Sequence, residues 1–215
     1  MQEYYARRAP EYEAIYDKPE RQAGLGLLRE WLAAQVHGRR VLEIACGTGY
    51  WTAAAAQSAA SIDAYDINQA TLDIARDKRL GAHVRLAIGD AYAPRPGKYD
   101  CVLACFWWSH VPKSRIPAFT MALAAAAEPR ARLILIDNAY APGSSTPIAR
   151  TDAQGNTYQQ RLLADGSAHE VLKNFPDAAE LRAALAPFCI DIAPEYHRHY
   201  WRLSASLKTR QEHAP

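Results

Sequence analysis

Small residues and carboxylates with the potential to bind a ligand follow three successive apolar runs. Gly47 and Gly49 come soon after the first run, residues 41–45, and an alanine-rich stretch continues from them. This pattern predicts a strand that turns sharply into a helix, where a ligand can approach the backbone and face the helix N-terminus. Asp66 follows the second run, where a carboxylate can accept hydrogen bonds from both hydroxyls of a ribose.

The third feature is the segment of Gly89, Asp90 and Ala91. An acidic side chain there can accept a hydrogen bond from an adenine amino group. Each feature also has a purely structural interpretation: the glycines as a chain reversal, Asp66 as a helix cap, and Asp90 as a turn residue. Their occurrence at three consecutive strand ends instead favours one crevice for a nucleoside-bearing ligand.

Apolar patterning predicts alternating strands and helices along the chain. The expected strands are residues 41–45, 61–65, 84–88, 100–106, 132–136, 189–193 and 199–206, and the expected helices are 20–36, 50–60, 69–80, 116–127 and 176–186. Such alternation implies parallel strands. We therefore predict an α/β fold with a doubly wound, mostly parallel seven-stranded sheet of the Rossmann-like type.

A composition change after Asn138 interrupts this alternation. Two arms, residues 158–163 and 169–174, flank Asp165 and Gly166 and predict a hairpin. We interpret it as an insertion before the last helix, not as a second domain. The predicted single domain, 1–215, comprises an N-terminal helical segment (1–38), a ligand-binding core (41–138), the insertion as a substrate lid (139–175) and a C-terminal helix with strands (176–206).

The composition is that of an ordinary globular protein, with 49% hydrophobic residues, 22% charged residues and a formal net charge of +2. The basic residues are scattered, which disfavours a nucleic-acid partner. The four cysteines lack the paired spacing of a zinc site, so we expect buried thiols and no metal site. No leader-like segment or long apolar run is present, and we expect a cytoplasmic protein with no membrane partner.

Residues 42–49, LEIACGTG, resemble the acidic-x-Gly-x-Gly-x-Gly loop of class I methyltransferases that use S-adenosylmethionine (SAM), especially the branch acting on small molecules. Ala45 stands where the first glycine of that loop usually lies. We expect a minor departure that leaves cofactor binding intact, because a methyl group is tolerated where the backbone dihedral angles are ordinary. A dinucleotide site is disfavoured, since Tyr50, Trp51 and Thr52 follow where a third glycine is required.

The resemblance implies SAM as cofactor, with S-adenosylhomocysteine (SAH) as product, and a role for each matching residue. Glu43 and the loop backbone at Ala45, Gly47 and Gly49 would hold the amino end of the methionine part. Asp66 would bind the ribose.

Around the adenine, the resemblance implies that Ile67 covers one face and that Asp90 with Ala91 contacts its edge. Cys105 and Phe106, which end the fourth predicted strand, would lie beside the methionine part.

The N-terminal segment 4–12, which contains Tyr5 and Tyr12, is similar to the helical flap of the family. In that flap an arginine, here Arg21, would pair with the cofactor carboxylate.

Methyl transfer from a sulfonium is an in-line displacement, so the enzyme contributes mainly alignment and exclusion of water. A general base is needed only if the acceptor loses a proton. His110, shortly after the fourth predicted strand, is the catalytic candidate, although anchoring its loop before Pro112 is the favoured role. Asp137 could orient a substrate or cap a turn. His197 and His199 are expected at the surface or in packing.

The predicted acceptor is an oxygen or nitrogen atom of a small metabolite or natural product. The alternatives are a catalytically silent SAM-binding protein and, less favoured because no N-P-P-Y signature follows the fourth strand, a nucleic-acid or protein methyltransferase. Both monomer and homodimer stay open. The aromatic residues expected to roof the site are Trp107, Trp108, Tyr140, Tyr158, Phe175, Tyr200 and Trp201. In the insertion, Arg150, Arg161 and Lys173 could meet an acidic substrate group, but solvated loop charges are the favoured interpretation.

Overall fold

The computed structural model describes residues 2–209 and has a seven-stranded sheet at its centre, in the order β3-β2-β1-β4-β5-β10-β9. Its strands are β1 (Arg40–Ile44), β2 (Ser61–Asp66), β3 (Val84–Ile88), β4 (Cys101–Cys105), β5 (Arg132–Asn138), β9 (Cys189–Tyr196) and β10 (Tyr200–Leu207). Strands β1 to β5 are parallel, and β10 runs antiparallel to both of its neighbours. The predicted mostly parallel sheet is confirmed.

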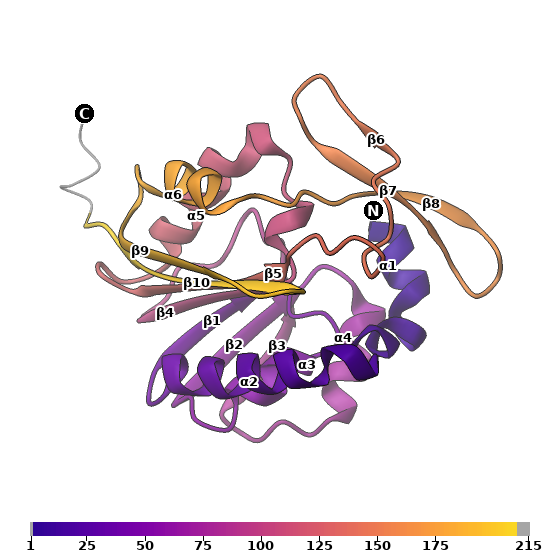
Figure 1. Cartoon of the computed structure of the whole chain (residues 1–215). Coiled ribbons are helices and arrows are strands. Elements are labelled where there is room, and N and C mark those ends of the chain that lie inside the picture. The colour runs from indigo at the N-terminus through magenta and orange to yellow at the C-terminus, as the bar shows by residue number, and fades with distance from the viewer. Residues whose placement is uncertain (1, 210–215) are drawn as a thin grey trace.

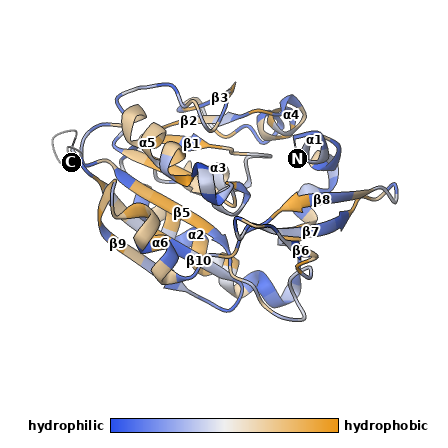
Figure 2. Ribbon diagram, turned by 90° about the horizontal axis from the view of Figure 1, so that it is seen from above, coloured by the Kyte–Doolittle hydropathy of each residue, from blue (hydrophilic) through white to orange (hydrophobic). Residues whose placement is uncertain are grey.

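Helices cover both faces of this sheet (Figure 1). The helices α2 (Gln22–Val36), α3 (Tyr50–Ala55) and α4 (Gln69–Asp77) pack on one face, and α5 (Ile116–Ala126) and α6 (Ala178–Leu185) pack on the other. Along each strand, successive side chains point to opposite faces of the sheet and so pack against the two helical layers in turn. In β1, Val41 packs with the α2 layer and Leu42 with the α5 layer. Figure 2 colours most of β5 as hydrophobic, and its residues from Leu133 to Asp137 are buried.

All five predicted helices extend beyond the observed ones, two of them by three residues or more at the C-terminal end. The helix expected over 69–80 ends at Asp77, because Arg79 has a φ of 52°, which a right-handed helix cannot accommodate. The helix expected over 50–60 ends at Ala55. The last helix, expected over 176–186, begins at Ala178, because Asp177 is its N-cap and forms a reciprocal capping box with Glu180.

The insertion forms a separate three-stranded antiparallel sheet, β6-β7-β8, instead of the simple hairpin that was expected. Strands β7 (Thr157–Leu162) and β8 (Ala168–Leu172) pair across the predicted turn, and β6 (Arg150–Thr151) adds to β7. A strand of two residues is too short for a period-two pattern to reveal it.

The N-terminal segment lies against this small sheet (Figure 1). It consists of α1 (Gln2–Arg8) and the 3-10 helices η1 (Ala9–Tyr16) and η2 (Pro19–Arg21). Tyr4 packs in one apolar cluster with Leu163 and Val171, and Arg7 pairs with Asp165 at the hairpin tip. The N-terminal segment and the insertion, which are distant in sequence, thus lie together beside the carboxyl ends of the central strands.

After β4 the chain makes two short 3-10 helices, η3 (Trp108–His110) and η4 (Lys113–Arg115), before α5 begins. Within residues 2–209, no helix combines the length and the apolar character needed to cross a membrane.

Candidate functional site

Two adjacent cavities open at the carboxyl ends of the central strands, beside the point where the sheet order reverses between β1 and β4. The first has a volume of about 270 Å³ and the second about 230 Å³. The first is lined by Gln2, Tyr5, Tyr12, Ala45, Gly47, Asp66, Ile67, Asn68, Thr71, Gly89, Asp90, Ala91, Tyr92, Cys105, Phe106, Trp107 and His110. Residues at the three predicted strand ends therefore share one cavity.

The glycine loop has the sharp turn that its sequence predicted. Gly47 and Gly49 have φ angles of 58° and 77°, a region that favours glycine. A Cβ atom on Gly49 would lie 2.9 Å from the Cβ atom of Ala75 in α4, so no side chain fits there. A Cβ atom on Gly47 would meet no atom within 4 Å, which leaves the backbone of the loop accessible to a ligand.

The expectation of ordinary backbone angles at Ala45 was wrong. Its φ is 51°, in the left-handed region, where a residue with a Cβ atom pays about 1–2 kcal/mol. Phe106, at the end of β4, is also left-handed, with a φ of 58°. Both residues line the first cavity, so two strained backbone positions stand on opposite sides of the switch point.

The carboxylate of Asp66 combines a structural and a ligand-facing role. Its Oδ1 accepts hydrogen bonds from the Asn68 N–H (2.8 Å) and the Thr71 hydroxyl (3.1 Å), which fix the start of α4. Its Oδ2 accepts from the Gly47 N–H at 2.9 Å, which ties the β1 loop to the end of β2. A carboxylate oxygen can accept two hydrogen bonds, so Oδ2 retains capacity toward the cavity for a further hydroxyl.

Glu43 lies beneath the glycine loop and not on the wall of the cavity. Its side chain is 1% exposed, and its Oε2 has no hydrogen-bond partner among residues 2–209. Burial penalises the charged form and raises the pKa of Glu43 to about 8, and the nearby Asp66 adds to this effect. A cationic group bound over the loop would supply the charge partner that this buried carboxyl lacks.

The other predicted adenine and methionine contacts line the first cavity. Ile67 is 44% exposed, Asp90 accepts a hydrogen bond from the Tyr92 N–H at 2.8 Å, and Ala91 is buried. Cys105 and Phe106 form the wall at the end of β4. The sequence did not single out other lining residues, among them Gln2, Asn68, Thr71 and Tyr92, because no motif marks them.

Tyr5 and Tyr12 line both cavities, whereas Arg21 lines only the second. The Arg21 guanidinium donates to the carbonyl and the hydroxyl of Ser144 in the insertion, at 3.2 and 3.0 Å. Arg21 therefore contacts the insertion beside the second cavity and does not line the first cavity.

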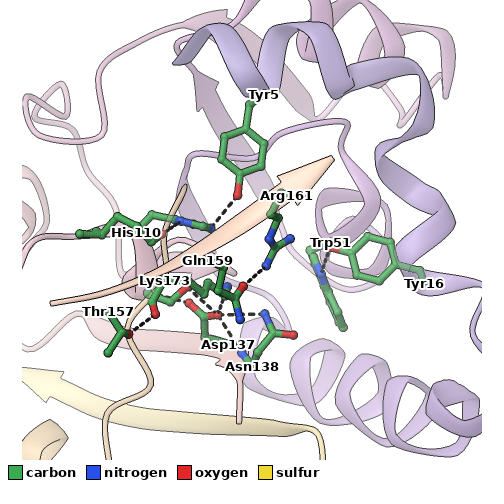
Figure 3. A network of polar contacts seen from close by, with 12 residues as sticks. Tyr5, Tyr16, Trp51, His110, Asp137, Asn138, Thr157, Gln159, Arg161 and Lys173 are labelled. Atoms are coloured by element: carbon green, nitrogen blue, oxygen red, sulfur yellow. Dashed lines mark hydrogen bonds and ion pairs between the residues drawn. The ribbon is translucent and has the colours of Figure 1, made fainter. Parts of the chain in front are cut away.

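His110 is 5% exposed and uses both ring nitrogens. Nδ1 lies 2.6 Å from the carbonyl oxygen of Leu172, which can only accept, so Nδ1 carries the proton and Nε2 accepts from the Tyr5 hydroxyl at 2.9 Å (Figure 3). Burial, followed by the charge of Lys173, lowers the pKa of His110 to about 3. A neutral imidazole engaged on both sides anchors its loop, as the favoured interpretation held.

Lys173 is not the solvated loop charge that was expected. It is 3% exposed, and its Nζ donates to the Asp137 carboxylate at 3.0 Å and to the Ser109 hydroxyl at 2.6 Å (Figure 3). Burial raises the pKa of Asp137, but the charge of Lys173 and the N–H groups of Ser109 and Asn138 outweigh it and lower the pKa overall. Asp137 is therefore a buried carboxylate that pairs with Lys173 and also accepts a hydrogen bond from the Ser109 N–H in η3, at 2.9 Å.

The other two basic residues of the insertion differ from one another. Arg150 pairs with Glu170 on the exposed side of the small sheet, as solvated charges do. Arg161 lines the second cavity, and its guanidinium donates to Gln159 at 2.6 Å. Arg150 lies opposite Tyr158 in the pairing of β6 with β7, and Tyr158 and Arg161 point to opposite faces of β7. Strand register therefore decides which charge faces inward, and this cannot be known before the register is fixed.

Most of the aromatic residues expected to roof the site do not reach it. Trp107 lines the first cavity and Phe175 the second. Trp108, Tyr200 and Trp201 are buried in the core, while Tyr140 and Tyr158 lie elsewhere on the insertion. His199 packs at the start of β10, and the four cysteines are buried free thiols, as expected.

The second cavity is lined by Tyr5, Arg8, Tyr12, Ile15, Lys18, Arg21, Phe106, His110, Asn138, Ser144, Ser145, Thr146, Gln159, Arg161, Lys173 and Phe175. Four of these residues, Tyr5, Tyr12, Phe106 and His110, also line the first cavity. The two cavities therefore meet at a shared wall.

A sheet in this order, with a glycine loop and an acidic residue at consecutive strand ends, defines a nucleoside-binding α/β protein. Comparison with known proteins makes the class specific. A family model for a methyltransferase domain matches residues 41–130. A ubiquinone biosynthesis O-methyltransferase from Xanthomonas campestris pv. campestris (strain B100) is 30% identical over 193 residues, which cover 85% of this chain and 77% of that protein.

Among solved structures, a DhpI–SAH complex has a TM-score of 0.79 at 26% identity, over 97% of this chain and 96% of that one. A DhpI–SAM–HEP complex has a TM-score of 0.78 at 24% identity, over 94% of each chain. The chain belongs to the class I SAM-dependent methyltransferases, with SAM as its cofactor and SAH as its product.

Proposed function

We propose that this enzyme transfers the methyl group of SAM to an oxygen or nitrogen atom of a small metabolite that occupies the second cavity. The observation that carries this proposal is the wall shared by the two cavities, formed by Tyr5, Tyr12, Phe106 and His110. In this proposal the sulfonium of a cofactor in the first cavity lies beside this wall, next to an acceptor in the second cavity. The curated relative named above is itself an O-methyltransferase.

In this proposal the first cavity holds the nucleoside. Asp66 Oδ2 accepts one ribose hydroxyl, and Ile67 and Trp107 enclose the adenine, with Asp90 at its edge. The methionine part passes over the glycine loop, where the buried carboxyl of Glu43 offsets its ammonium group. Arg21, which lines the adjoining second cavity, is the cation assigned to the cofactor carboxylate.

When bound, SAM supplies an electrophilic methyl carbon: the acceptor's lone pair forms the new bond while the carbon–sulfur bond breaks and its electron pair stays on sulfur. The chain contributes position and exclusion of water. Tyr5, Tyr12 and Phe106 form the closed wall around the junction, and His110 holds Tyr5 in place through its hydroxyl. This function requires no base from the protein when the acceptor atom is already unprotonated.

Calorimetric titration tests the placement of the cofactor. We expect SAM and SAH to bind and NAD not to bind, and we expect Asp66→Asn to weaken SAH binding by about tenfold or more, since a hydrogen bond to a charged group contributes roughly 1.5–3 kcal/mol. Asp73→Asn, an exposed change on α4 away from the cavity, is the matched control. Equal SAH affinity in the Asp66→Asn variant and the wild type would contradict the placement.

A second measurement, release of methyl label from SAM onto a pool of small metabolites, tests the transfer itself. A protein that binds SAM but labels no acceptor would have the cofactor site without the proposed activity.

A further inference from the structure

The second cavity is lined by basic side chains and by no acidic ones. Its cations are Arg8, Lys18, Arg21, Arg161 and Lys173, and none of its lining residues is an aspartate or a glutamate. The remaining polar lining is rich in hydrogen-bond donors, including the hydroxyls of Ser144, Ser145 and Thr146. A cavity of this composition attracts negative charge.

Partners already present on the protein offset only part of this charge. Lys173 is neutralised by the buried Asp137 at 3.0 Å. Arg21 is assigned to the cofactor carboxylate by the proposed function, on which the present inference rests. Arg8 and Arg161 form no ion pair with any acidic residue in the part of the chain that the structure describes. At least one negative charge is therefore missing from the cavity.

The two unpaired guanidinium groups are held in place by neutral contacts. Arg161 donates to Gln159 through one terminal nitrogen, and its buried Nε has no hydrogen-bond partner among residues 2–209 (Figure 3). Arg8 donates to the Tyr4 hydroxyl at 3.0 Å and lies 5.4 Å from the ring centre of Tyr12. Fixed donors without acceptors are expensive to bury unless a ligand supplies the acceptors.

The pKa values of Lys173, His110, Tyr5 and Tyr12 all respond to the positive charge around the second cavity. The pKa of Lys173 is lowered by burial, against the opposing effect of Asp137, and the charges of Arg161 and Arg8 add to the lowering. Arg161 also contributes, after burial and Lys173, to the lowered pKa of His110. Tyr5 and Tyr12 feel both Arg8 and Arg161, so the field extends to the wall shared with the cofactor cavity.

We propose that the methyl acceptor is a small organic anion, a carboxylate or a tetrahedral oxyanion such as a phosphonate, bound by Arg161 and Arg8 in the second cavity. Guanidinium groups bind such oxyanions through paired hydrogen bonds. An oxyanion is also unprotonated at neutral pH, so its methylation needs no base, in agreement with a His110 whose Nε2 lone pair is occupied by Tyr5.

The test measures binding of phenylphosphonate, benzoate and the neutral benzamide to the SAH-loaded protein by calorimetry. We expect both anions to bind at least about tenfold more tightly than benzamide, and Arg161→Gln to weaken anion binding by about tenfold or more. The ratio between phenylphosphonate and benzoate distinguishes a tetrahedral from a planar anion. Arg150→Gln, which removes the exposed arginine of the same small sheet, should leave anion binding within about twofold.

SAH affinity separates the two proposals. If the wild type does not bind SAH, the proposed function fails. If SAH binds but benzamide binds as tightly as the two anions, or if neither anion binds at high millimolar concentration, the anion proposal fails. Thermal unfolding of each variant shows whether it is folded. If Arg161→Gln does not fold, Arg8→Gln replaces it with the same expected loss, and unchanged anion binding in a folded variant overturns the proposal.

Discussion

The Tyr5 hydroxyl donates a hydrogen bond of 2.9 Å to Nε2 of His110, and this hydrogen bond joins the N-terminal helix α1 to the loop after β4. The opposite ring nitrogen of His110 donates to the carbonyl of Leu172 at the end of β8. One neutral imidazole therefore connects the N-terminal segment, the central sheet and the insertion at the wall between the two cavities.

Acid should destabilise the protein through this imidazole. The pKa of His110 is about 3 in the folded protein and 6.5 in the free side chain, so between these values the unfolded chain binds a proton that the folded protein does not. Stability from the neutral ring is complete above about pH 6.5 and is lost as the pH falls toward 3. Urea unfolding from pH 7 to pH 4 should show a shallower loss in His110→Gln than in the wild type, and parallel curves would refute the buried neutral ring.

Breaking the ion pair of Lys173 with Asp137 should be costly. Lys173→Met leaves the Asp137 carboxylate buried without its counter-charge, which should lower the free energy of unfolding by about 3–5 kcal/mol. Chemical denaturation measures this loss, and Lys173→Met combined with Asp137→Asn should recover much of it. Lys113→Met removes the exposed ion pair with Glu180 and should cost no more than about 1 kcal/mol. Similar losses in the two single variants would show that the buried charge is compensated by other groups.

Ala45→Gly should stabilise the protein. Ala45 has a φ of 51°, so glycine relieves about 1–2 kcal/mol of strain while adding about 0.4–1 kcal/mol of chain entropy to the unfolded state. The expected net gain is up to about 1 kcal/mol, measured by thermal or urea unfolding, with SAH affinity retained. Arg79→Gly, at an exposed residue with a φ of 52°, should give a similar gain in stability. A loss of stability in Ala45→Gly would mean that its methyl group makes compensating contacts.

The ligand-free protein should become less stable as the pH rises from about 4.5 to 8, because of the buried Glu43. Because burial raises the pKa of Glu43 to about 8 from its usual 4.5, the folded protein holds a proton that the unfolded chain lacks between these values. Stability linked to this proton is complete below about pH 4.5 and is lost as the pH rises through 8. Glu43→Gln should flatten this decline in urea unfolding between pH 5 and pH 9. If SAM places its ammonium group over the loop, binding at pH 7 should also release a proton, which calorimetry in two buffers detects.

Much of the cofactor cavity could be predicted from local sequence. Gly47, Asp66 and Asp90 each mark a strand end, and parallel strands bring such ends to one edge of a sheet, so their convergence follows from topology alone. The register of the small sheet could not be predicted in this way. Arg150 and Arg161 are both basic residues of the same insertion, and only strand pairing decides that Arg161 faces the cavity. The sequence therefore could not separate a ligand-facing arginine from a solvated one.

The amino-acid sequence by itself determined the order of strands and helices, the two-layer burial of β5 and the glycine turn after β1, since these depend on residues close together in the chain. Only the tertiary structure decided that Lys173 meets Asp137, that Tyr5 meets His110 and that Ala45 is left-handed. These are properties of side chains and backbone brought together across long separations, where packing and the surrounding charge fix conformation and protonation, and no local pattern encodes them.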